Sequence, residues 1–537
     1  MNRRLPLVVA ALSLLLSPLS TLGAQAATVK AGAKCSKAGQ IIHMNAMIYT
    51  CLKSGKKLVW SKGVKENPGP SNSGNGQNGG PTQQQNAPSD KEFLYMKRIG
   101  MSCSTNGVFG FTGGSLAICK NNVVKYALPA DVPGMPAGGY TSRPSWYPTL
   151  AQQLGKTSEP TCKPSSISFT SPVIPLDQLA PSVPYGAMIG GHVTPIDHAY
   201  LGLKPLYKDP ATRTDADYVP ISAPADGVIT SISNLGSPTS IRVVMEHGCN
   251  VATVYMVINK LSGVLASYAS EFATNGANRQ VSIPIKAGQE FARQRDNAMD
   301  FNVWDGTQWL SGFANPLSYI TGDAWKPYTA DPLPFFTPTI RSAMEAVMQH
   351  SAAPRFGKID WDVIGAAAGN WYLDGTFGYG GHLLTEFQNA TSDIPGGQVN
   401  GKNDYSWSHL AIAPHEVDST KWIFSTGWWS DPAGDPHQMM LTIDGSKPTP
   451  DKLTAANGLV AYQLTSFVPN EPAGTPARIP GTTAPFAVGY TLGTGFPQGV
   501  VGLQVNSDGS LSVEINTAIT DSAKFTGFTS AKRTYRR

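Results

Sequence analysis

The sequence predicts a mainly β protein built from several domains, and three observations carry this prediction. The chain has 537 residues, which is more than one ordinary domain contains. It is rich in glycine and proline, with 55 and 42 residues, and only 14% of its residues are charged. This composition favours strands and turns over long helices. Residues 166–322 contain short strand-like runs separated by turn residues, without helical periodicity.

The first 26 residues have the features of a cleaved export signal. A basic start, MNRR, precedes an apolar stretch, and Ala24-Gln25-Ala26 forms a small-x-small cleavage site. A membrane anchor is the alternative, but Pro18 interrupts the short leucine run and the cleavage triplet follows directly. No later stretch is apolar for the ~20 residues that a membrane span requires. We therefore expect no transmembrane segment after signal cleavage, and an extracellular or envelope-associated protein able to form disulfides.

The six cysteines predict three disulfide bridges, because an even count in an exported chain indicates a disulfide framework. In two pairs the cysteines are sixteen positions apart, and the first cysteine of each opens a Cys-Ser-x-x-Gly phrase. The third pair follows by elimination. Metal ligation is the competing interpretation, but the cysteines lack C-x-x-C spacing and nearby histidines. The expected bridges are Cys35–Cys51, Cys103–Cys119 and Cys162–Cys249.

Residues 27–65 form a small basic cysteine module, called the head below, with eight lysines and no acidic residue. The net charge of +5 therefore combines a basic head with a mildly acidic remainder. A lysine cluster is usually just a solvated face. Unopposed charges on so small a unit favour a polyanion instead, such as an anionic wall polymer, a glycan or peptidoglycan, and we expect no nucleic acid partner. The lysines are Lys30, Lys34, Lys37, Lys53, Lys56, Lys57, Lys62 and Lys65.

Five segments follow the head in order. Residues 66–92 consist mainly of Gly, Pro, Asn, Gln and Ser, which cannot form a core, so we expect a disordered linker. Residues 93–135 contain the second Cys-Ser-x-x-Gly phrase and are expected to repeat the head's small disulfide-closed module. A proline-rich connector, residues 136–165, leads to a β domain over 166–322. A C-terminal β-rich domain occupies 323–537.

Four phrases of the β domain occur in a familiar order within about residues 190–306. They are VPISAPADGVITSIS, RVVMEHGCNVATVYMVINKLS, IPIKAGQEFARQ and MDFNVWDG. Taken in this order they resemble the lysostaphin-type zinc endopeptidases, the duplicated-hybrid-motif family. The resemblance implies a barrel-sandwich hybrid fold, which is a compact β-sandwich. It also implies a family whose zinc enzymes cut peptidoglycan cross-bridges.

The resemblance also indicates where zinc ligands should lie. A catalytic zinc needs three fixed protein ligands and an open position for water. The family supplies its metal-binding and catalytic groups through His-x-x-x-Asp, Tyr-x-His and His-x-His motifs. Matching Asp197 to the family aspartate places Val193 at the first histidine, and His192 lies one residue early. On a strand, that slip turns a side chain to the opposite face unless a bulge corrects it.

The later histidine positions are substituted as well. Matching Tyr255 places Val257 at the next histidine, and matching MDFNVWDG places Ala298 and Asp300 at the His-x-His pair. No histidine occurs over residues 248–349. The peptidase-like domain is therefore expected to lack catalytic residues and to serve binding or scaffolding.

Two further statements complete the expected site. We expect no cofactor; the alternative is a cell-wall zinc endopeptidase with an unusual metal site made of His192, Asp197 and Asp300. In the favoured interpretation, His198 and Tyr255 lie at the lip of the groove that the family uses for substrate. A metal held by two aspartates and one histidine is chemically feasible, but nothing replaces the lost catalytic histidines.

The C-terminal β-rich domain is expected to contain one helix, with Thr337 as its cap and Pro338 in its first turn. A hairpin is predicted around Asp508-Gly509. A cluster of aromatic and polar residues in this region would suit contact with a sugar ring. Such a tryptophan pair more often has one ring in the core and its neighbour half exposed. The residues of this cluster are Trp428, Trp429, Asp431 and His437.

Overall fold

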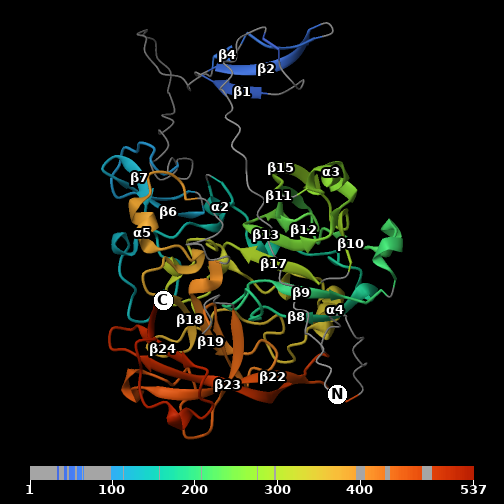
Figure 1. Ribbon diagram of the computed structural model, residues 1–537. Helices are drawn as coiled ribbons and strands as arrows, with labels where there is room; N and C mark the ends of the chain where they lie inside the picture. The colour runs from blue at the N-terminus through green and yellow to red at the C-terminus, as the bar shows by residue number, and fades with distance from the viewer. Residues whose placement is uncertain are drawn as a thin grey trace, which may run out of the picture. The chain divides into compact units, whose positions relative to one another are not determined.

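The structure, a computed structural model, consists mainly of β-strands, which confirms the predicted fold class (Figure 1). The chain divides into two compact units, Met1–Asn86 and Ala87–Arg537, and the second is called the body below. Within the first unit the structure describes residues 33–34, 41–44, 47–54, 57–62 and 64–65. In the body it describes residues 98–537 except 113, 157, 207, 275, 296–297, 395–404, 430–435 and 474–486. The predicted export signal and linker lie outside the described residues.

The head contains a small antiparallel sheet. Strands β1, β2 and β3 are neighbours in that order, and β4 also pairs with β2. The strands are β1 (Ile41–Met44), β2 (Met47–Ser54), β3 (Lys57–Trp60) and β4 (Val64–Lys65).

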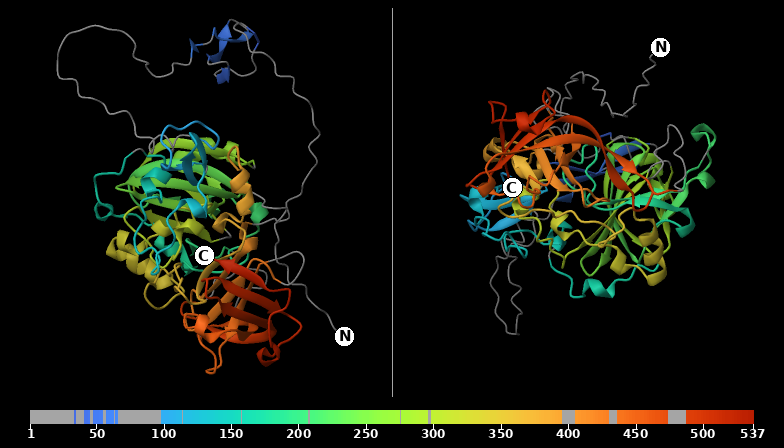
Figure 2. Two further views of the ribbon diagram at one scale, coloured as in Figure 1. Left: turned by 90° about the vertical axis from the view of Figure 1, so that its left-hand side faces the viewer. Right: turned by 90° about the horizontal axis from the view of Figure 1, so that it is seen from below.

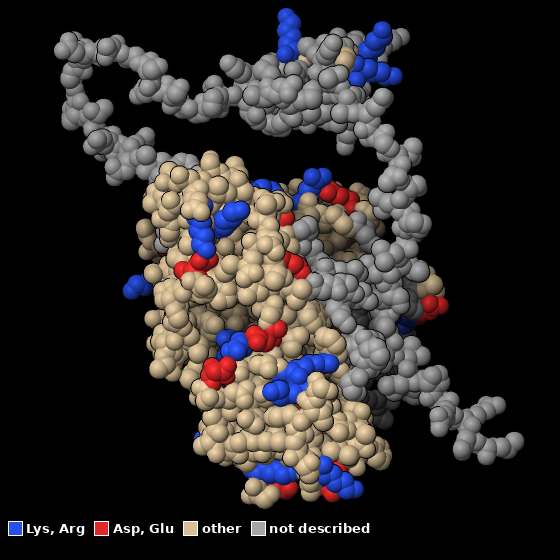
Figure 3. All heavy atoms as spheres, turned by 60° about the vertical axis from the view of Figure 1, so that its left-hand side comes forward, with Lys and Arg blue, Asp and Glu red and all other residues tan. Residues whose placement is uncertain are grey.

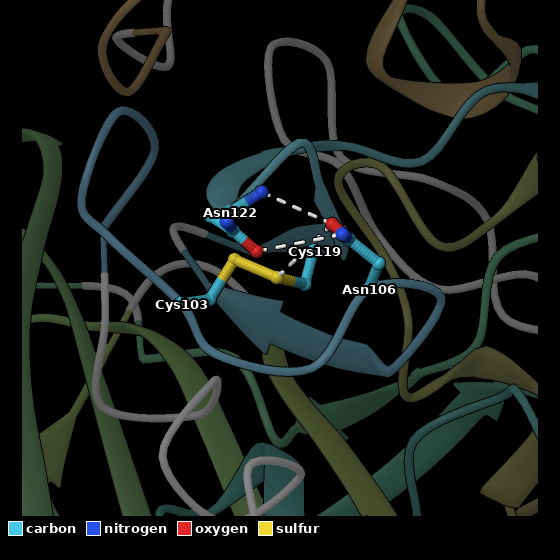
Figure 4. The surroundings of a disulfide bond; sticks show 4 residues. All are labelled: Cys103, Asn106, Cys119 and Asn122. Atoms are coloured by element: carbon cyan, nitrogen blue, oxygen red, sulfur yellow. Dashed lines mark hydrogen bonds between the residues drawn. A yellow bond between two sulfur atoms is a disulfide. The ribbon is translucent and has the colours of Figure 1, made fainter.

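The second cysteine module is a three-stranded antiparallel sheet closed by the predicted Cys103–Cys119 disulfide. Its strands are β5 (Phe109–Thr112), β6 (Ser115–Lys120) and β7 (Val123–Tyr126). Two asparagines beside the disulfide are hydrogen-bonded to each other. The backbone nitrogen of Asn122 donates to Oδ1 of Asn106 at 3.0 Å (Figure 4). Asn122 and Asn121 both have positive φ, which the two-residue turn between β6 and β7 requires and asparagine tolerates.

The two modules share one strand register. The first hairpin of each pairs its residues at the same relative positions, with a constant offset in residue number. The equivalent pairs are Ile41–Thr50 with Phe109–Ile118, and Met44–Met47 with Thr112–Ser115. A common register at a constant offset supports the interpretation of the two modules as copies of one unit.

A seven-stranded antiparallel sheet, called the large sheet, forms the middle of the body, with the order β15-β11-β12-β13-β17-β9-β8. A three-stranded sheet, β10-β16-β14, packs on one of its faces. The predicted strand phrases supply β10 to β13 and β15 to β17. The large sheet consists of β8 (Leu179–Val183), β9 (Ala199–Leu203), β11 (Gly227–Ser237), β12 (Ser240–Gly248), β13 (Val251–Ile258), β15 (Asn278–Ile285) and β17 (Met299–Asp305). The small sheet consists of β10 (Val219–Ser222), β14 (Lys260–Leu261) and β16 (Glu290–Gln294).

The large sheet is buried on both faces, which explains the nearly continuous apolar runs of its central strands. Val243 and Met245 of β12 pack in the core shared with the small sheet. Val244, between them, points to the other face and packs with residues of the second cysteine module. Burying each such side chain contributes roughly 1.5–3 kcal/mol. This second face carries the cavity described below.

The predicted proline-rich connector is folded onto the body. It contains helix α2 (Leu150–Gln153) and the buried Tyr147, whose hydroxyl donates to the carbonyl oxygen of Ala324 at 2.8 Å. The predicted Cys162–Cys249 disulfide is present and ties the connector to the turn between β12 and β13.

The predicted helix is α4 (Pro338–Val347), with Thr337 at the cap position and Pro338 in the first turn. The Thr337 side chain makes no capping hydrogen bond. The helix does not belong with the C-terminal strands, because Ile340 and Met344 pack in the core of the large sheet. The boundary expected between residues 322 and 323 therefore cuts through one core.

Two short helices complete the α-helices of the described residues, which also contain short 3-10 helices. Helix α3 (Ala269–Phe272) packs beside β14, and α5 (Leu384–Asn389) lies in the C-terminal region, where one helix was expected. No helix among the described residues is both long enough and apolar enough to cross a membrane.

Eight antiparallel strands at the end of the body form a closed barrel, coloured orange to red in Figure 2. Its interior is filled by large side chains such as Trp371, Phe424 and Tyr462. The predicted hairpin at Asp508-Gly509 joins β23 to β24, with Gly509 at φ +79°. The strands are β18 (Gly369–Leu373), β19 (His409–Pro414), β20 (Trp422–Thr426), β21 (His437–Thr442), β22 (Val460–Asn470), β23 (Thr491–Val505), β24 (Leu511–Asn516) and β25 (Arg533–Arg536).

Candidate functional site

A cavity of about 610 Å³ lies on the second face of the large sheet. Its walls come from three parts of the sequence that were expected to be separate domains. Strands β11, β12, β13 and β17 contribute one wall, and Ser115 and Tyr126 of the second cysteine module contribute another. Residues 192–198 and parts of 321–405 complete it. The cavity therefore exists only when all of these segments are packed together.

Three of the predicted site residues meet at the edge of this cavity. Nδ1 of His198 lies 3.4 Å from Oδ1 of Asp197, and Nε2 lies 3.4 Å from Oδ2 of Asp300. All three residues are buried, and none is more than 6% exposed. Strand β9 begins next to His198 and pairs with β17, which carries Asp300, so the sheet itself brings the residues together.

The surroundings of this trio shift the pKa values of the two carboxylates in opposite directions. Oδ2 of Asp197 accepts hydrogen bonds from Nδ2 of Asn302 at 3.0 Å and from Nε1 of Trp325 at 2.9 Å. Burial would raise the pKa of Asp197, but hydrogen bonds, led by the one from His198, hold that pKa below its usual value. Asp300 has less such help, and burial raises its pKa to about 6. Asp197 is therefore the permanent anion of the site.

The two histidines differ in the same way. Burial would lower the pKa of His198, but the hydrogen bond with Asp197 and the charge of Asp300 raise it above its usual value. His192 lies beside it, with ring centroids 5.4 Å apart. Burial lowers the pKa of His192 to about 3. His198 can therefore carry positive charge near neutral pH, whereas His192 remains a neutral ring.

This arrangement does not fit a zinc ion held by His192, Asp197 and Asp300. The imidazole of His198 occupies the space between the two carboxylates, and Asn302 and Trp325 already use one carboxylate oxygen of Asp197. Within the part of the chain that the structure describes, no three His, Cys, Asp or Glu side chains are grouped as a metal site requires.

Tyr255 lies in the core and not at the cavity lip. Its side chain is fully buried, with ring centroids 4.9 Å from Phe291 and 5.5 Å from Phe301. Val257, at the position that the resemblance assigns to a histidine, has φ +60° where the pairing of β12 with β13 is irregular. A β-branched residue in this conformation is strained.

The wall of the cavity also contains residues that the sequence did not single out. Arg242 of β12 lies with its guanidinium carbon 5.8 Å from the ring centroid of Trp304 and 5.6 Å from that of Trp325. The two indole rings are 5.2 Å apart and tilted by 31°. An arginine inside the apolar run "SIRVVM" was the available signal, because a charge in a strand buried on both faces needs a partner.

A buried lysine adjoins the same site. Lys326 is 1% exposed, and its Nζ lies 3.4 Å from Oδ2 of Asp323 and 4.1 Å from the ring centroid of Tyr379. Burial raises the pKa of Asp323, while the Lys326 charge counteracts this effect. A buried charge is tolerated only when it is paired, so Asp323 and the ring of Tyr379 together hold Lys326 in place.

The predicted sugar-contact cluster lies at the barrel. Trp429 is 9% exposed and contributes to the barrel core, and its ring centroid lies 4.7 Å from that of His437. Trp428 is partly exposed, and the Arg533 guanidinium covers its ring at 3.9 Å. One ring is therefore in the core and its neighbour is half exposed. Asp431 lies outside the described residues.

The lysines of the head are only partly described. Lys34, Lys57 and Lys62 are exposed. Cys35 lies outside the described residues, as do Lys30, Lys37 and Lys56, and the side chains of Cys51, Lys53 and Lys65 are not described. On the face of the body drawn in Figure 3, basic and acidic side chains lie close together between wide uncharged areas.

No protein-family model matches this chain, and no curated protein matches its sequence. The cavity and the head are therefore the features from which a function can be inferred.

Proposed function

We propose that the protein is an exported, envelope-associated binding protein. Its peptidase-like domain resembles the lysostaphin-type fold but does not carry out zinc chemistry. The observation that carries this proposal is the position of His198 between Asp197 and Asp300. The resemblance assigns both aspartates to functional positions of the family, and the fold brings them to opposite sides of one imidazole. A ring with raised pKa neutralises the carboxylates that a metal would otherwise neutralise.

The trio is suited to holding the loop 192–198 against the sheet. Asp197 is hydrogen-bonded by Asn302 and Trp325, which come from β17 and from the segment after it. A group that activates water needs an open position and a base with a free lone pair. Asp197 accepts hydrogen bonds from three neighbours, and Asp300 lies against the other side of the His198 ring, although its Oδ1 has no hydrogen-bond partner among the described residues. We therefore assign the trio to architecture and the binding to the adjoining cavity.

The cavity has the size and composition of a binding site for a small molecule or a short oligomeric ligand. Its volume of about 610 Å³ lies within the range of roughly 300–1,000 Å³ that is usual for ligand pockets. Aromatic rings, serine and threonine hydroxyls and several charged groups share its lining. The two disulfides indicate an oxidising, extracellular environment. We propose that the lysines of the head hold the protein at an anionic wall polymer, glycan or peptidoglycan while the cavity takes its ligand.

The test measures metal and lysis together on the purified mature protein. We expect far less than one equivalent of zinc by elemental analysis and no cleavage of peptidoglycan or oligoglycine cross-bridges. An Asp197→Ala variant should lose stability without losing any lytic activity. One equivalent of zinc, with lysis abolished both by a chelator and by Asp197→Ala, would replace this proposal with the endopeptidase.

A further inference from the structure

The position of Arg242 is the main evidence for the chemical class of ligand that the cavity binds. It lies on β12 between Ile241 and Val243, which are fully buried, and its guanidinium packs against the rings of Trp304 and Trp325. Among the residues that the structure describes, Arg242 makes no hydrogen bond and no ion pair. Burial lowers its pKa, and the charges of Asp323 and Asp197 counteract this effect only in part. A half-buried cation without a hydrogen-bonded or ion-paired carboxylate gains from an anion that reaches it.

Trp304 adds to the same wall a second donor group that lacks an acceptor. It is 4% exposed, and its Nε1 has no hydrogen-bond partner among the described residues. Oγ1 of Thr321, which also lines the cavity, is buried without such a partner. A buried donor without an acceptor costs roughly 1–3 kcal/mol. Guanidinium and indole groups can only donate, so a ligand that satisfies both must present acceptor oxygens.

The cavity favours a carboxylate over a phosphate. A guanidinium binds the two oxygens of a carboxylate with its planar pair of N–H groups. Asp197 and Asp323 line the same cavity, and each already has a cationic neighbour, His198 and Lys326 respectively. Arg242 is therefore the one further positive charge of this wall, which suits a ligand with a single negative charge.

The remaining lining favours a saccharide over a peptide strand. β12 lies between β11 and β13, so its backbone groups are already paired and a peptide cannot add to this part of the sheet as a further strand. Recognition must therefore use side chains. The rings of Trp304, Trp325 and Tyr379 line the cavity, and aromatic faces of this kind pack well against the apolar face of a sugar ring.

Arg242, Trp304 and Trp325 also line a second cavity of about 350 Å³. The three side chains therefore form a wall with a cavity against each of its two sides. This arrangement gives room for more than one sugar unit near the same arginine.

We infer that the cavity binds the carboxylate of an acidic saccharide, with Arg242 holding the carboxylate and Trp304 donating its indole N–H to the same ligand. This inference rests on the proposed binding function and specifies its ligand class. The carboxylate can come from a lactyl ether, as in N-acetylmuramic acid, or from a uronic acid.

The first test compares matched sugars on the full mature chain by isothermal titration calorimetry. The pairs are N-acetylmuramic acid with N-acetylglucosamine, and glucuronic acid with glucose; glucose 6-phosphate is the phosphate control. We expect at least tenfold tighter binding of the acid in one pair, which identifies the source of the carboxylate. Equal binding of acid and neutral sugar in both pairs would overturn the inference, and so would tighter binding of the phosphate.

The second test uses variants whose folding is checked by thermal unfolding. Arg242→Gln should remove the preference for the acid, and Arg242→Lys should reduce it severalfold because it retains the charge without the planar pair of donors. Trp304→Phe keeps a ring and should weaken binding about three- to tenfold through the lost donor. Arg293→Gln is the matched control, since Arg293 on β16 is paired with Glu290 at 2.7 Å.

The outcomes separate this inference from the proposed function. A folded Arg242→Gln protein that still prefers the acid overturns the inference alone. If Arg242→Gln does not fold, Arg242→Lys and the comparison of sugars on the unaltered protein decide the question. Zinc-dependent lysis overturns the proposed function whatever the sugar preference is.

Discussion

The backbone nitrogen of Trp60 donates a hydrogen bond to the carbonyl oxygen of Ala33 at 2.9 Å. Val124 makes the equivalent bond to Met101 at 2.8 Å in the second cysteine module. Ala33 and Met101 each lie two positions before the first cysteine of their module. Trp60 pairs with Cys51 across β2 and β3, as Val124 pairs with the second cysteine of its own module across β6 and β7. The two modules therefore share this arrangement around their cysteines, although the second hairpin is longer in the head and the head has the additional strand β4.

This equivalence predicts a disulfide between Cys35 and Cys51. We expect non-reducing peptide mapping to recover this pair together with the two bridges of the body. Replacing both cysteines with serine should destabilise the head by about 3 kcal/mol, because the bridge closes a short loop in a unit with a small core. A peptide linking Cys35 to Cys103 would contradict the equivalence of the two modules.

The exposed lysines of the head predict binding to the envelope that depends on salt. The full mature chain should sediment with envelope fragments at 0.1 M salt and be released near 1 M, where the screening length falls from about 10 Å to about 3 Å. Reversing Lys34, Lys57 and Lys62 to glutamate should abolish sedimentation at low salt.

A matched control changes the charge of the body by the same amount. It reverses three exposed lysines far from the head in sequence, Lys163, Lys204 and Lys532. This variant should sediment like the unaltered protein. Binding that ignores salt, or equal loss in both variants, would exclude an electrostatic role for the head.

His247 predicts a loss of stability in mild acid. Its Nδ1 lies 2.9 Å from the carbonyl oxygen of Asp226 and its Nε2 lies 2.9 Å from Oγ1 of Thr253, and burial lowers its pKa to about 4. Below pH 6.5 this histidine takes up a proton in the unfolded chain but stays neutral in the folded protein until the pH approaches 4. The free energy of unfolding should therefore fall between pH 6.5 and 4, by up to about 3 kcal/mol from this residue, and not further below pH 4.

The measurement is urea unfolding at several pH values for the unaltered protein and for His247→Gln. The variant should be less stable at pH 7 but lose less stability on acidification. Comparing the two slopes isolates His247 from other buried groups such as His409, whose pKa burial lowers to about 3. Parallel slopes would show that His247 does not contribute.

Val257 predicts an unusual tolerance of glycine. At φ +60° a valine is strained by roughly 1–3 kcal/mol, and glycine removes this strain. Val257→Gly should leave the free energy of unfolding within about 1 kcal/mol of the unaltered protein. Val254→Gly is the control, because Val254 is buried in the same strand without positive φ, and it should cost more than about 2 kcal/mol. Equal losses at both positions would show that residue 257 is not strained.

Local patterns predicted the elements that depend on near neighbours in sequence. The alternating phrases gave the strands of the large sheet, and Asp508-Gly509 marked a tight hairpin. Thr337 as a cap and Pro338 in the first turn predicted a helix, but they could not show that its apolar residues Ile340 and Met344 pack against the large sheet. The expected boundary before residue 323 was placed wrongly for this reason, since composition does not record which apolar faces meet.

The candidate site was only partly predictable for the same reason. The motif positions identified Asp197 and Asp300, and the fold brings both to His198. Arg242 and Trp304 are distant from these residues in sequence and match no motif. These two residues line the cavity because distant segments pack together, and no local sequence pattern predicts that these segments meet. Tyr255 shows the opposite case. A motif match predicted that its ring lies at the lip of the groove, but the ring packs in the core.

The closing pair of the barrel also limits how quickly that part of the chain can fold. Tyr372 of β18 pairs with Arg536 of β25, so the seam joins residues separated by the rest of the barrel sequence. Contacts of such long sequence separation form slowly, because the loop must close before the pairing stabilises it. Until then β18 and β25 have unpaired edges that can recruit strands from other molecules. The barrel is therefore a part of the body that is exposed to aggregation during folding.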